Sequence, residues 1–98
     1  MSVFTLGIWT VNDGREDDFV HAWWDLAERT KEDFPDATAT LLRDRDQQNR
    51  FVSFGPWESL DQIEQWRSST TFQTGVAKIR ELVDDFVPFT LDQAAEIR

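Results

Sequence analysis

The chain has 98 residues, which suits a single domain over residues 1–98. Its formal charge is −9, from 10 Lys and Arg against 19 Asp and Glu, so we expect neither nucleic acid nor an anionic membrane surface as a partner. Without Cys and with one His, the chain lacks the residues of disulfides and of the common Cys and His metal sites, and no metal is expected.

Aromatic side chains are abundant, with five Trp and eight Phe. Each can bury roughly 150–250 Å², and a chain this small has difficulty covering so much apolar area. We therefore expect part of it to face a partner subunit or a ligand cavity. No apolar segment approaches the length of a membrane span and the N-terminus shows no secretory pattern, so a cytoplasmic location is expected.

The first half of the chain predicts a strand, a helix and a hairpin. Residues 3–11 are rich in β-branched and aromatic residues on both alternating faces, which is typical of a strand covered on both sides. Residues 15–31 carry apolar side chains at helical spacing, and Pro35 stops the helix. Residues 37–45 and 50–57, separated by a short polar turn, predict an antiparallel hairpin.

The second half predicts a helical segment broken in two and a last strand. Ser59 begins the first helix with a Ser-x-x-Gln capping box, residues 68–69 interrupt it, and a second helix ends at residues 84–85. Residues 86–94 alternate and predict a fourth strand, in which Pro88 must lie at a sheet edge or a bulge because it has no N–H to donate.

The order of elements is therefore β-α-β-β-α-β, which predicts a ferredoxin-like α+β fold with a four-stranded antiparallel sheet. Helices would cover one face of this sheet. Large apolar side chains also lie on the other face, so we expect a homodimer that covers it.

Several stretches are similar to one known family. They are GREDDF at residues 14–19, LRD at 42–44, FVSFGPWES at 51–59, and WRSS at 66–69 followed by Phe72. Together they resemble the antibiotic biosynthesis monooxygenase family of dimeric α+β barrels over nearly the whole chain.

The resemblance implies a dimer in which two four-stranded sheets face each other, with a pocket in each subunit between the sheet and its helices. Members of the family oxidise polycyclic aromatic compounds with molecular oxygen and without a metal or organic cofactor. It thus implies an oxidoreductase, a cofactor-independent monooxygenase, whose partners are a small aromatic or polyketide-like molecule and oxygen. No cofactor is expected.

Another branch of this family degrades haem, and the sequence departs from its pattern. Val76 stands where that branch has its haem-ligating His, and Gly7 stands where it has an Asn. The single His, His21, falls on the solvent-facing side of another helix. Haem degradation by that mechanism is therefore not expected.

The resemblance assigns the catalytic position to Trp66, which would stack on a flat substrate and donate its indole N–H to a substrate oxygen. Helical spacing also allows Trp66 and Trp23 to be ordinary core residues. Two cations, Arg67 and Arg80, could reach the pocket mouth and hold an acidic substrate. The expected apolar lining is Trp9, Trp23, Phe54, Phe72 and Val76. No convincing general base for substrate deprotonation is found.

Two alternatives stay open. The first is a non-catalytic domain that binds a small molecule in the same apolar pocket. The second is an isomerase, cyclase or decarboxylase on the same fold, which would need a carboxylate or His inside the pocket.

Overall fold

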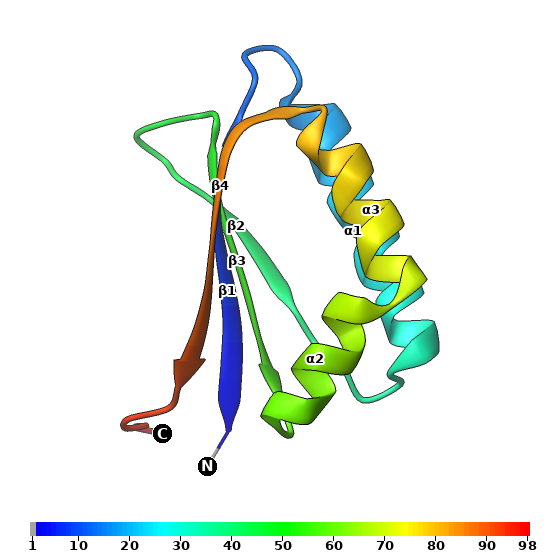
Figure 1. The fold of residues 1–98 in the computed structure, drawn as a ribbon. Helices are drawn as coiled ribbons and strands as arrows, with labels where there is room; N and C mark the ends of the chain where they lie inside the picture. Colours follow the sequence, from blue (N-terminus) through cyan, green and yellow to red (C-terminus); the bar gives the residue numbers. More distant parts are fainter. Residues whose placement is uncertain (1) are drawn as a thin grey trace.

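The computed structural model describes residues 2–98. The chain forms four strands and three helices in the order β-α-β-β-α-α-β (Figure 1). They are β1 (Val3–Val11), α1 (Glu16–Asp33), β2 (Thr40–Arg43), β3 (Arg50–Trp57), α2 (Leu60–Ser68), α3 (Thr70–Arg80) and β4 (Val83–Asp92). The predicted ferredoxin-like α+β fold is confirmed, including the division of the second helical segment into two helices.

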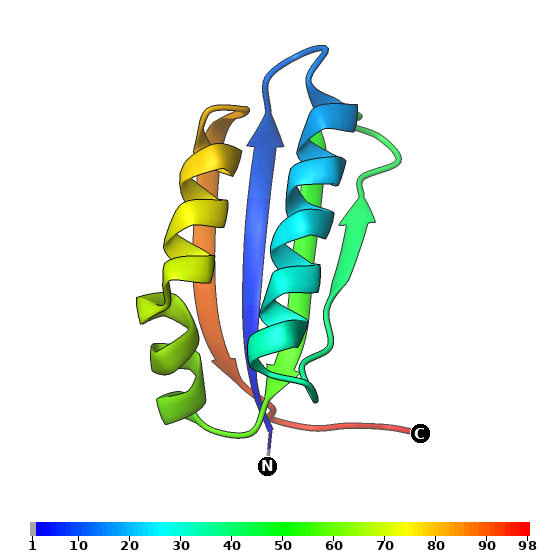
Figure 2. The ribbon, with the colours of Figure 1, turned by 90° about the vertical axis from the view of Figure 1, so that its right-hand side faces the viewer.

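The four strands form one antiparallel sheet in the order β2-β3-β1-β4. β1 lies between β3 and β4, and its residues pair with both neighbours along nearly its whole length. All three helices cover the same face of the sheet, α1 over the β3 side and α2 with α3 over the β4 side (Figures 1 and 2). The molecule therefore has two layers, and any space between them is bounded by strand side chains below and helix side chains above.

The helices α1 and α3 pack closely because of one glycine. A Cβ built at Gly75 of α3 would lie 2.7 Å from Cδ1 of Leu26 of α1, which is closer than real Cβ contacts allow. The bare backbone of Gly75 therefore lets Leu26 pack directly against α3. This contact holds the two long helices together near the middle of the helix layer.

The predicted end of the third helix was wrong. Residues 84–85 were expected to close it, but α3 ends at Arg80 and β4 begins at Val83. Leu82 is buried and its carbonyl accepts the backbone N–H of Asn12 at 2.9 Å, which ties the turn to the end of β1. The register of β1 with β4 shifts between Thr10 and Val11, so a bulge accommodates the two acidic residues within the strand.

Pro88 lies where its missing N–H requires. It belongs to β4, an edge strand of the sheet, and pairs with Gly7 of β1. The predicted place at a sheet edge is therefore confirmed. A second proline, Pro56, lies near the end of β3, and the pairing of β3 with β1 runs through Gly55 and Pro56 to Trp57 without a shift. Pro56 is tolerated there because β2 begins at Thr40, opposite Phe54, and leaves the outer side of Pro56 unpaired.

The second face of the sheet is apolar and carries no helix in this chain (Figure 1). Directly paired residues of an antiparallel sheet share a face, so the pairing of Leu6 with Phe54 and Phe89, and of Ile8 with Val87, places these five side chains together. Val87 and Phe89 are 39% and 40% exposed. Among residues 2–98, no helix is long and apolar enough to cross a membrane.

Candidate functional site

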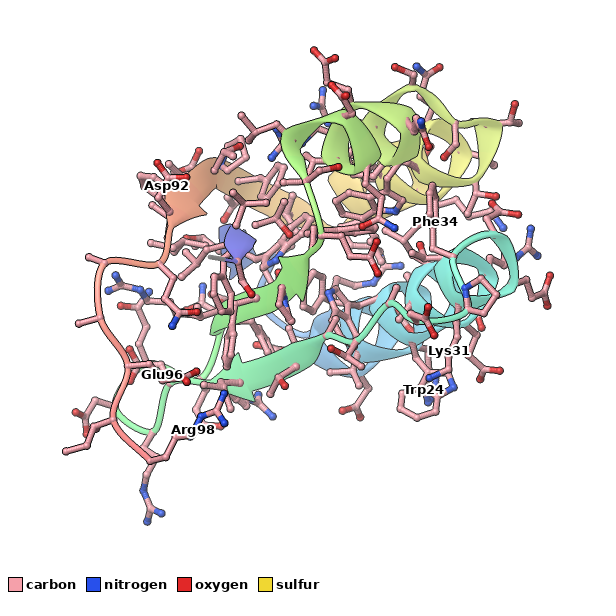
Figure 3. The ribbon with its side chains drawn as sticks, turned by 90° about the horizontal axis from the view of Figure 1, so that it is seen from below. Trp24, Lys31, Phe34, Asp92, Glu96 and Arg98 are labelled. Atoms are coloured by element: carbon pink, nitrogen blue, oxygen red, sulfur yellow. The ribbon has the colours of Figure 1, made fainter. Side chains whose placement is uncertain are left out.

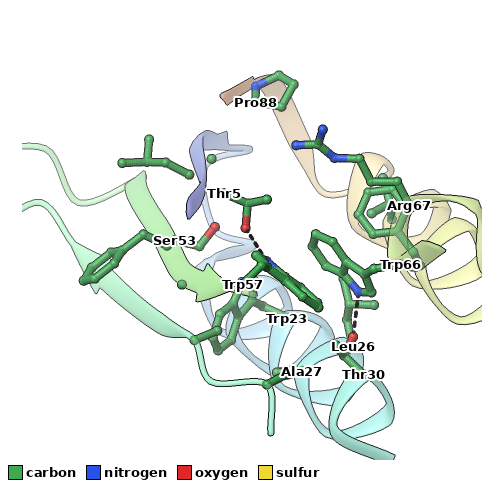
Figure 4. Close-up of a pocket in the computed structure, with 18 of the residues that line it drawn as sticks. Thr5, Trp23, Leu26, Ala27, Thr30, Ser53, Trp57, Trp66, Arg67 and Pro88 are labelled. Carbon is green, nitrogen blue, oxygen red and sulfur yellow. Dashed lines mark hydrogen bonds between the residues drawn. The ribbon is translucent and has the colours of Figure 1, made fainter. Parts of the chain in front are cut away.

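A cavity of about 690 Å³ lies between the sheet and the helix layer. This volume falls in the range of small-molecule binding sites. Its lining comes from β1, β3 and β4 on the sheet side and from all three helices on the other (Figure 4). The cavity is bounded at one end by the closely packed core and extends toward the end of the molecule that holds α2.

Small residues of the two central strands form the bottom of this cavity. Thr5 pairs with Gly55, and Gly7 pairs with Ser53, and all four line the cavity. We call these four residues the floor. A Cβ at Gly7 would lie 2.7 Å from Cε1 of Phe86 and 3.2 Å from the Ser53 hydroxyl. The missing side chain of Gly7 thus leaves room for the Phe86 ring and the Ser53 hydroxyl, which lie close to the floor there.

Five tryptophans line the cavity, and three of them donate the indole N–H to a hydroxyl. Trp9 donates to Ser53 Oγ at 2.9 Å, and Trp57 donates to Thr5 Oγ1 at 3.1 Å. Trp66 of α2 donates to Thr30 Oγ1 of α1 at 3.0 Å (Figure 4). These bonds, together with ring packing around Trp9 and Trp57, fix the planes of three large rings beside the cavity.

The tryptophans also contact other aromatic rings. Trp9 stacks on Phe86, with centroids 3.8 Å apart and an interplanar angle of 14°. The ring centroids of Trp57 and Trp66 lie 4.9 Å apart, and the ring of Phe72 meets that of Trp66 edge-on with centroids 4.6 Å apart. The cavity therefore has flat aromatic walls at both ends of its floor, which suits a flat apolar ligand.

All eight residues predicted for the site line this one cavity. They are Trp9, Trp23, Phe54, Trp66, Arg67, Phe72, Val76 and Arg80. Phe54 differs from the others, because strand alternation puts its side chain on the uncovered face of the sheet, beside that of Leu6. Phe54 therefore borders the cavity through the backbone of β3 and not through its ring. The part these residues play in binding stays a prediction.

The expected role of one predicted residue needs correction. Trp66 was expected to donate its indole N–H to a substrate oxygen, but that N–H is already bonded to Thr30, which is buried. An indole has one N–H and no acceptor. Trp66 is therefore positioned to offer its ring surface, and its N–H fixes the orientation of that surface.

Charged side chains around the cavity are mostly cationic, although the chain carries −9 overall. Lys31, Arg67 and Arg80 line it, together with the carboxylate of Glu28. None of the three cations forms a salt bridge with another residue in the described part of the chain. Glu28 instead accepts the indole N–H of Trp24. The cavity is thus a locally positive region of an acidic protein, which favours an anionic ligand.

The cations lie on two flanks of the helix layer. Arg67 of α2 reaches across to β4, where it donates to Thr90 Oγ1 at 3.0 Å (Figure 4). Arg80 closes α3 on the same β4 side. Lys31 and Trp24 extend from α1 on the other side (Figure 3), where Glu28 balances the charge of Lys31. Two of the three lining cations therefore lie on the β4 side, and we call Arg67 and Arg80 the β4-side rim.

Four polar residues of the site were not predicted from the sequence: the hydroxyl-bearing Thr5, Thr30 and Ser53, and also Lys31. Nothing in a strand sequence marks a Thr or Ser as the acceptor of a tryptophan 44 or 52 residues away, because only the sheet register reveals the pair. His21 is exposed on α1 and does not line the cavity. Within residues 2–98, no three His, Asp or Glu side chains come together as a metal site.

Comparison with known proteins places the chain among related sequences and folds. The family model for antibiotic biosynthesis monooxygenase matches residues 3–78. A comparison with curated protein sequences found no match. Among solved structures, a mutant of SnoaB, a cofactor-independent oxygenase from Streptomyces nogalater, superposes with a TM-score of 0.88 at 21% identity, covering 98% of this chain and 96% of its own.

Two further structures show the same fold at lower identity. An antibiotic biosynthesis monooxygenase gives a TM-score of 0.82 at 16% identity, with 95% of this chain and 99% of the other covered. Rv0793 from Mycobacterium tuberculosis gives 0.83 at 15% identity, with 100% of both chains covered. At such identities these structures support the fold alone.

Proposed function

Because the chain belongs to the antibiotic biosynthesis monooxygenase family, we propose that it is a cofactor-independent monooxygenase. Its substrate is a small aromatic or polyketide-like molecule, bound flat in the cavity between sheet and helices. The observation that carries this proposal is the cavity itself, which has aromatic walls, a low floor and a cationic surround.

The reaction we propose converts an activated CH₂ group beside a phenol ring into a carbonyl. One oxygen atom of O₂ enters the carbonyl and the other leaves as water, so the carbon loses four electrons and oxygen gains four. The substrate first loses a proton, because its electron-rich anion is the species that reduces oxygen. The cations of the cavity stabilise this anion and lower the pKa of the bound substrate.

The proton has no obvious acceptor inside the site. Glu28 is the one carboxylate among the lining residues, and it is exposed and bonded to Trp24. Substrate acidification by Arg67, Arg80 and Lys31 would let water at the cavity mouth take the proton. The protein would then contribute binding, charge stabilisation and orientation, and the chemistry would reside in the substrate and oxygen.

The test is oxygen consumption by metal-free protein with a panel of anthrone- and naphthol-type phenols in an oxygen electrode. We expect substrate-dependent uptake above the uncatalysed rate. Trp66→Ala removes the aromatic wall and should lower this rate at least tenfold, whereas Trp66→Phe keeps a flat ring and should retain most of it. Circular dichroism verifies that both variants are folded.

A different outcome would reject the proposal. If no compound in the panel is oxidised faster than in buffer, the chain is not an oxygenase of this class. If a folded Trp66→Ala protein retains the parent rate, catalysis takes place away from this cavity.

One observation favours a second candidate, a non-catalytic domain that binds a small aromatic molecule. Among the described residues, the cavity lining contains no His or Asp, and its one carboxylate, Glu28, is exposed and bonded to Trp24. The lining therefore offers no buried acid–base group of the kind that an isomerase, cyclase or decarboxylase would need. Binding of the phenol panel, seen as quenching of Trp fluorescence, together with no oxygen uptake would favour this candidate.

We also propose that the chain works as a homodimer through the uncovered face of the sheet. That face is apolar and partly exposed in the single chain, at Val87 and Phe89 among others. Sedimentation velocity at micromolar concentration should give twice the chain mass of 11.5 kDa. Val87→Asp buries two charges in a symmetric interface and should shift the protein to monomer, whereas Val20→Asp on α1 should not. A monomeric parent would reject this proposal.

A further inference from the structure

The floor of the cavity carries two hydroxyl groups that each have a hydrogen left to donate. Thr5 Oγ1 accepts the indole N–H of Trp57, and Ser53 Oγ accepts that of Trp9. An indole nitrogen only donates, whereas a hydroxyl has one hydrogen and two acceptor positions. Each hydroxyl therefore acts as the acceptor toward its tryptophan and must direct its own hydrogen elsewhere.

Within residues 2–98, no hydrogen bond uses either of these two hydrogens. Among the hydrogen bonds formed within residues 2–98, the Thr5 and Ser53 hydroxyls appear only as acceptors. Both residues lie in central strands, where Thr5 pairs with Gly55 and Thr90 and the backbone carbonyls serve the sheet. Thr30 differs, because a helical threonine can donate to the carbonyl four residues earlier.

The two hydroxyls also share one place in the cavity. Ser53 stands two residues before Gly55, the partner of Thr5, so the two are diagonal neighbours on the same face of the sheet. Such neighbours lie about 7–8 Å apart or less. Figure 4 shows both side chains on the cavity side of their strands, with the ring of Trp57 beside Thr5. A ring system that meets the floor with one edge can therefore contact both hydroxyls.

We propose that Thr5 and Ser53 form an oxygen-binding subsite that selects flat ring systems bearing ketone or phenolate oxygens on the edge that meets the sheet. The subsite rests on the proposed function, since it names what the same cavity recognises. In an otherwise apolar floor, an acceptor oxygen gains two hydrogen bonds, and a plain hydrocarbon leaves two hydroxyls without partners. The tryptophans set the direction in which the two hydroxyls donate.

Two probes of the same shape test the subsite. Anthraquinone-2-sulfonate and anthracene-2-sulfonate share the ring system and the charge, and they differ in the two ketone oxygens. Titration calorimetry measures the dissociation constant of each probe with the parent protein, Thr5→Val, Ser53→Ala and the double variant. Thr5→Ser keeps a hydroxyl at the site, and Thr40→Val makes the same substitution on the uncovered face of the sheet.

We expect the parent to bind the quinone about tenfold more tightly than the hydrocarbon. Each single loss of a hydroxyl should weaken quinone binding about threefold and change hydrocarbon binding less than twofold, and the double variant should show no preference. Thr5→Ser and Thr40→Val should behave like the parent. The ratio of the two probes removes any effect of the indole N–H left without an acceptor, and Ser53→Ala carries the test if Thr5→Val does not fold.

A preference for the quinone that survives in the double variant would overturn the subsite. A parent that binds both probes equally would also overturn it, while leaving the flat-ligand cavity in place. Failure of both probes to bind would overturn the subsite together with the flat-ligand cavity. Oxygen consumption is measured separately, so a protein that shows the predicted preference but consumes no oxygen retains the subsite and loses the oxygenase assignment.

Discussion

Where β1 ends, the space between sheet and helices is filled, whereas where β1 begins the same two layers enclose the cavity. At the filled end, Val11, Phe19 and Ile79 are fully buried, and the rings of Phe19 and Phe51 pack with centroids 4.9 Å apart. At the hollow end the strands present the small residues of the floor, and the rings of Phe86 and Trp9 lie against it at Gly7. We call these the solid end and the hollow end.

The difference is produced mainly by side-chain size in β1 and β3. Trp9 pairs with Phe51 toward the solid end, and two positions further along the strands Gly7 pairs with Ser53. The helices cross both regions with the same backbone, so they do not move inward to fill the space above small residues. A cavity in this fold is therefore set by a few strand positions, while the solid end supplies the stability that the hollow end lacks.

Stabilities of matched phenylalanine variants would test this division most strongly. Phe19→Ala at the solid end should lower the free energy of unfolding by about 3–5 kcal/mol, since it empties a fully packed site. Phe72→Ala at the hollow end should cost about 1–2 kcal/mol, because Phe72 is only partly buried and faces space that already exists. Urea unfolding at one fixed protein concentration measures both.

Equal losses from the two variants would contradict the division into ends. That result would mean that the hollow end is packed in solution as tightly as the solid end. A Phe72→Ala loss that grows when anthraquinone-2-sulfonate is present would instead sharpen the comparison, since a bound ligand stabilises the folded state and adds to the packing there.

Much of the fold was predictable from the sequence because its strongest signals are local. The bounds of β1 and β3 agree with the prediction, since both strands are rich in β-branched and aromatic residues and end at polar turns. The start of β4 was missed because an acidic pair, Asp84 and Asp85, looks like the end of a helix. A bulge opposite the end of β1 resolves this, and a bulge depends on pairing that a single segment does not reveal.

The site was predictable in its apolar part and hidden in its polar part. Helical spacing and family resemblance led to Trp66, Phe72 and Val76, which all line the cavity. The hydroxyls of Thr5 and Ser53 look like ordinary strand residues until the register places each beside a tryptophan. The role of the Trp66 N–H was misassigned for the same reason, because its acceptor lies 36 residues away in sequence.

The cations that line the cavity provide a second test of the comparison, with a smaller expected effect. Arg80→Gln removes one cation from the β4-side rim, and it should weaken binding of anthraquinone-2-sulfonate about two- to fivefold at low salt, as expected for an exposed charge pair of about 0.5–1 kcal/mol. Arg45→Gln makes the same change of charge at an exposed residue outside the cavity. Titration calorimetry at two salt concentrations compares the two variants with the parent.

We expect the Arg80→Gln effect to shrink as salt rises, because exposed charges are screened over about 8–10 Å at 0.1–0.15 M. The Arg45→Gln protein should differ little from the parent at either concentration. Equal weakening by both variants would mean that the ligand responds to the net charge of the whole chain. Weakening by Arg80→Gln alone would show that the positive surround acts locally, so that an acidic protein draws an anion to its hollow end while its solid end contributes only stability.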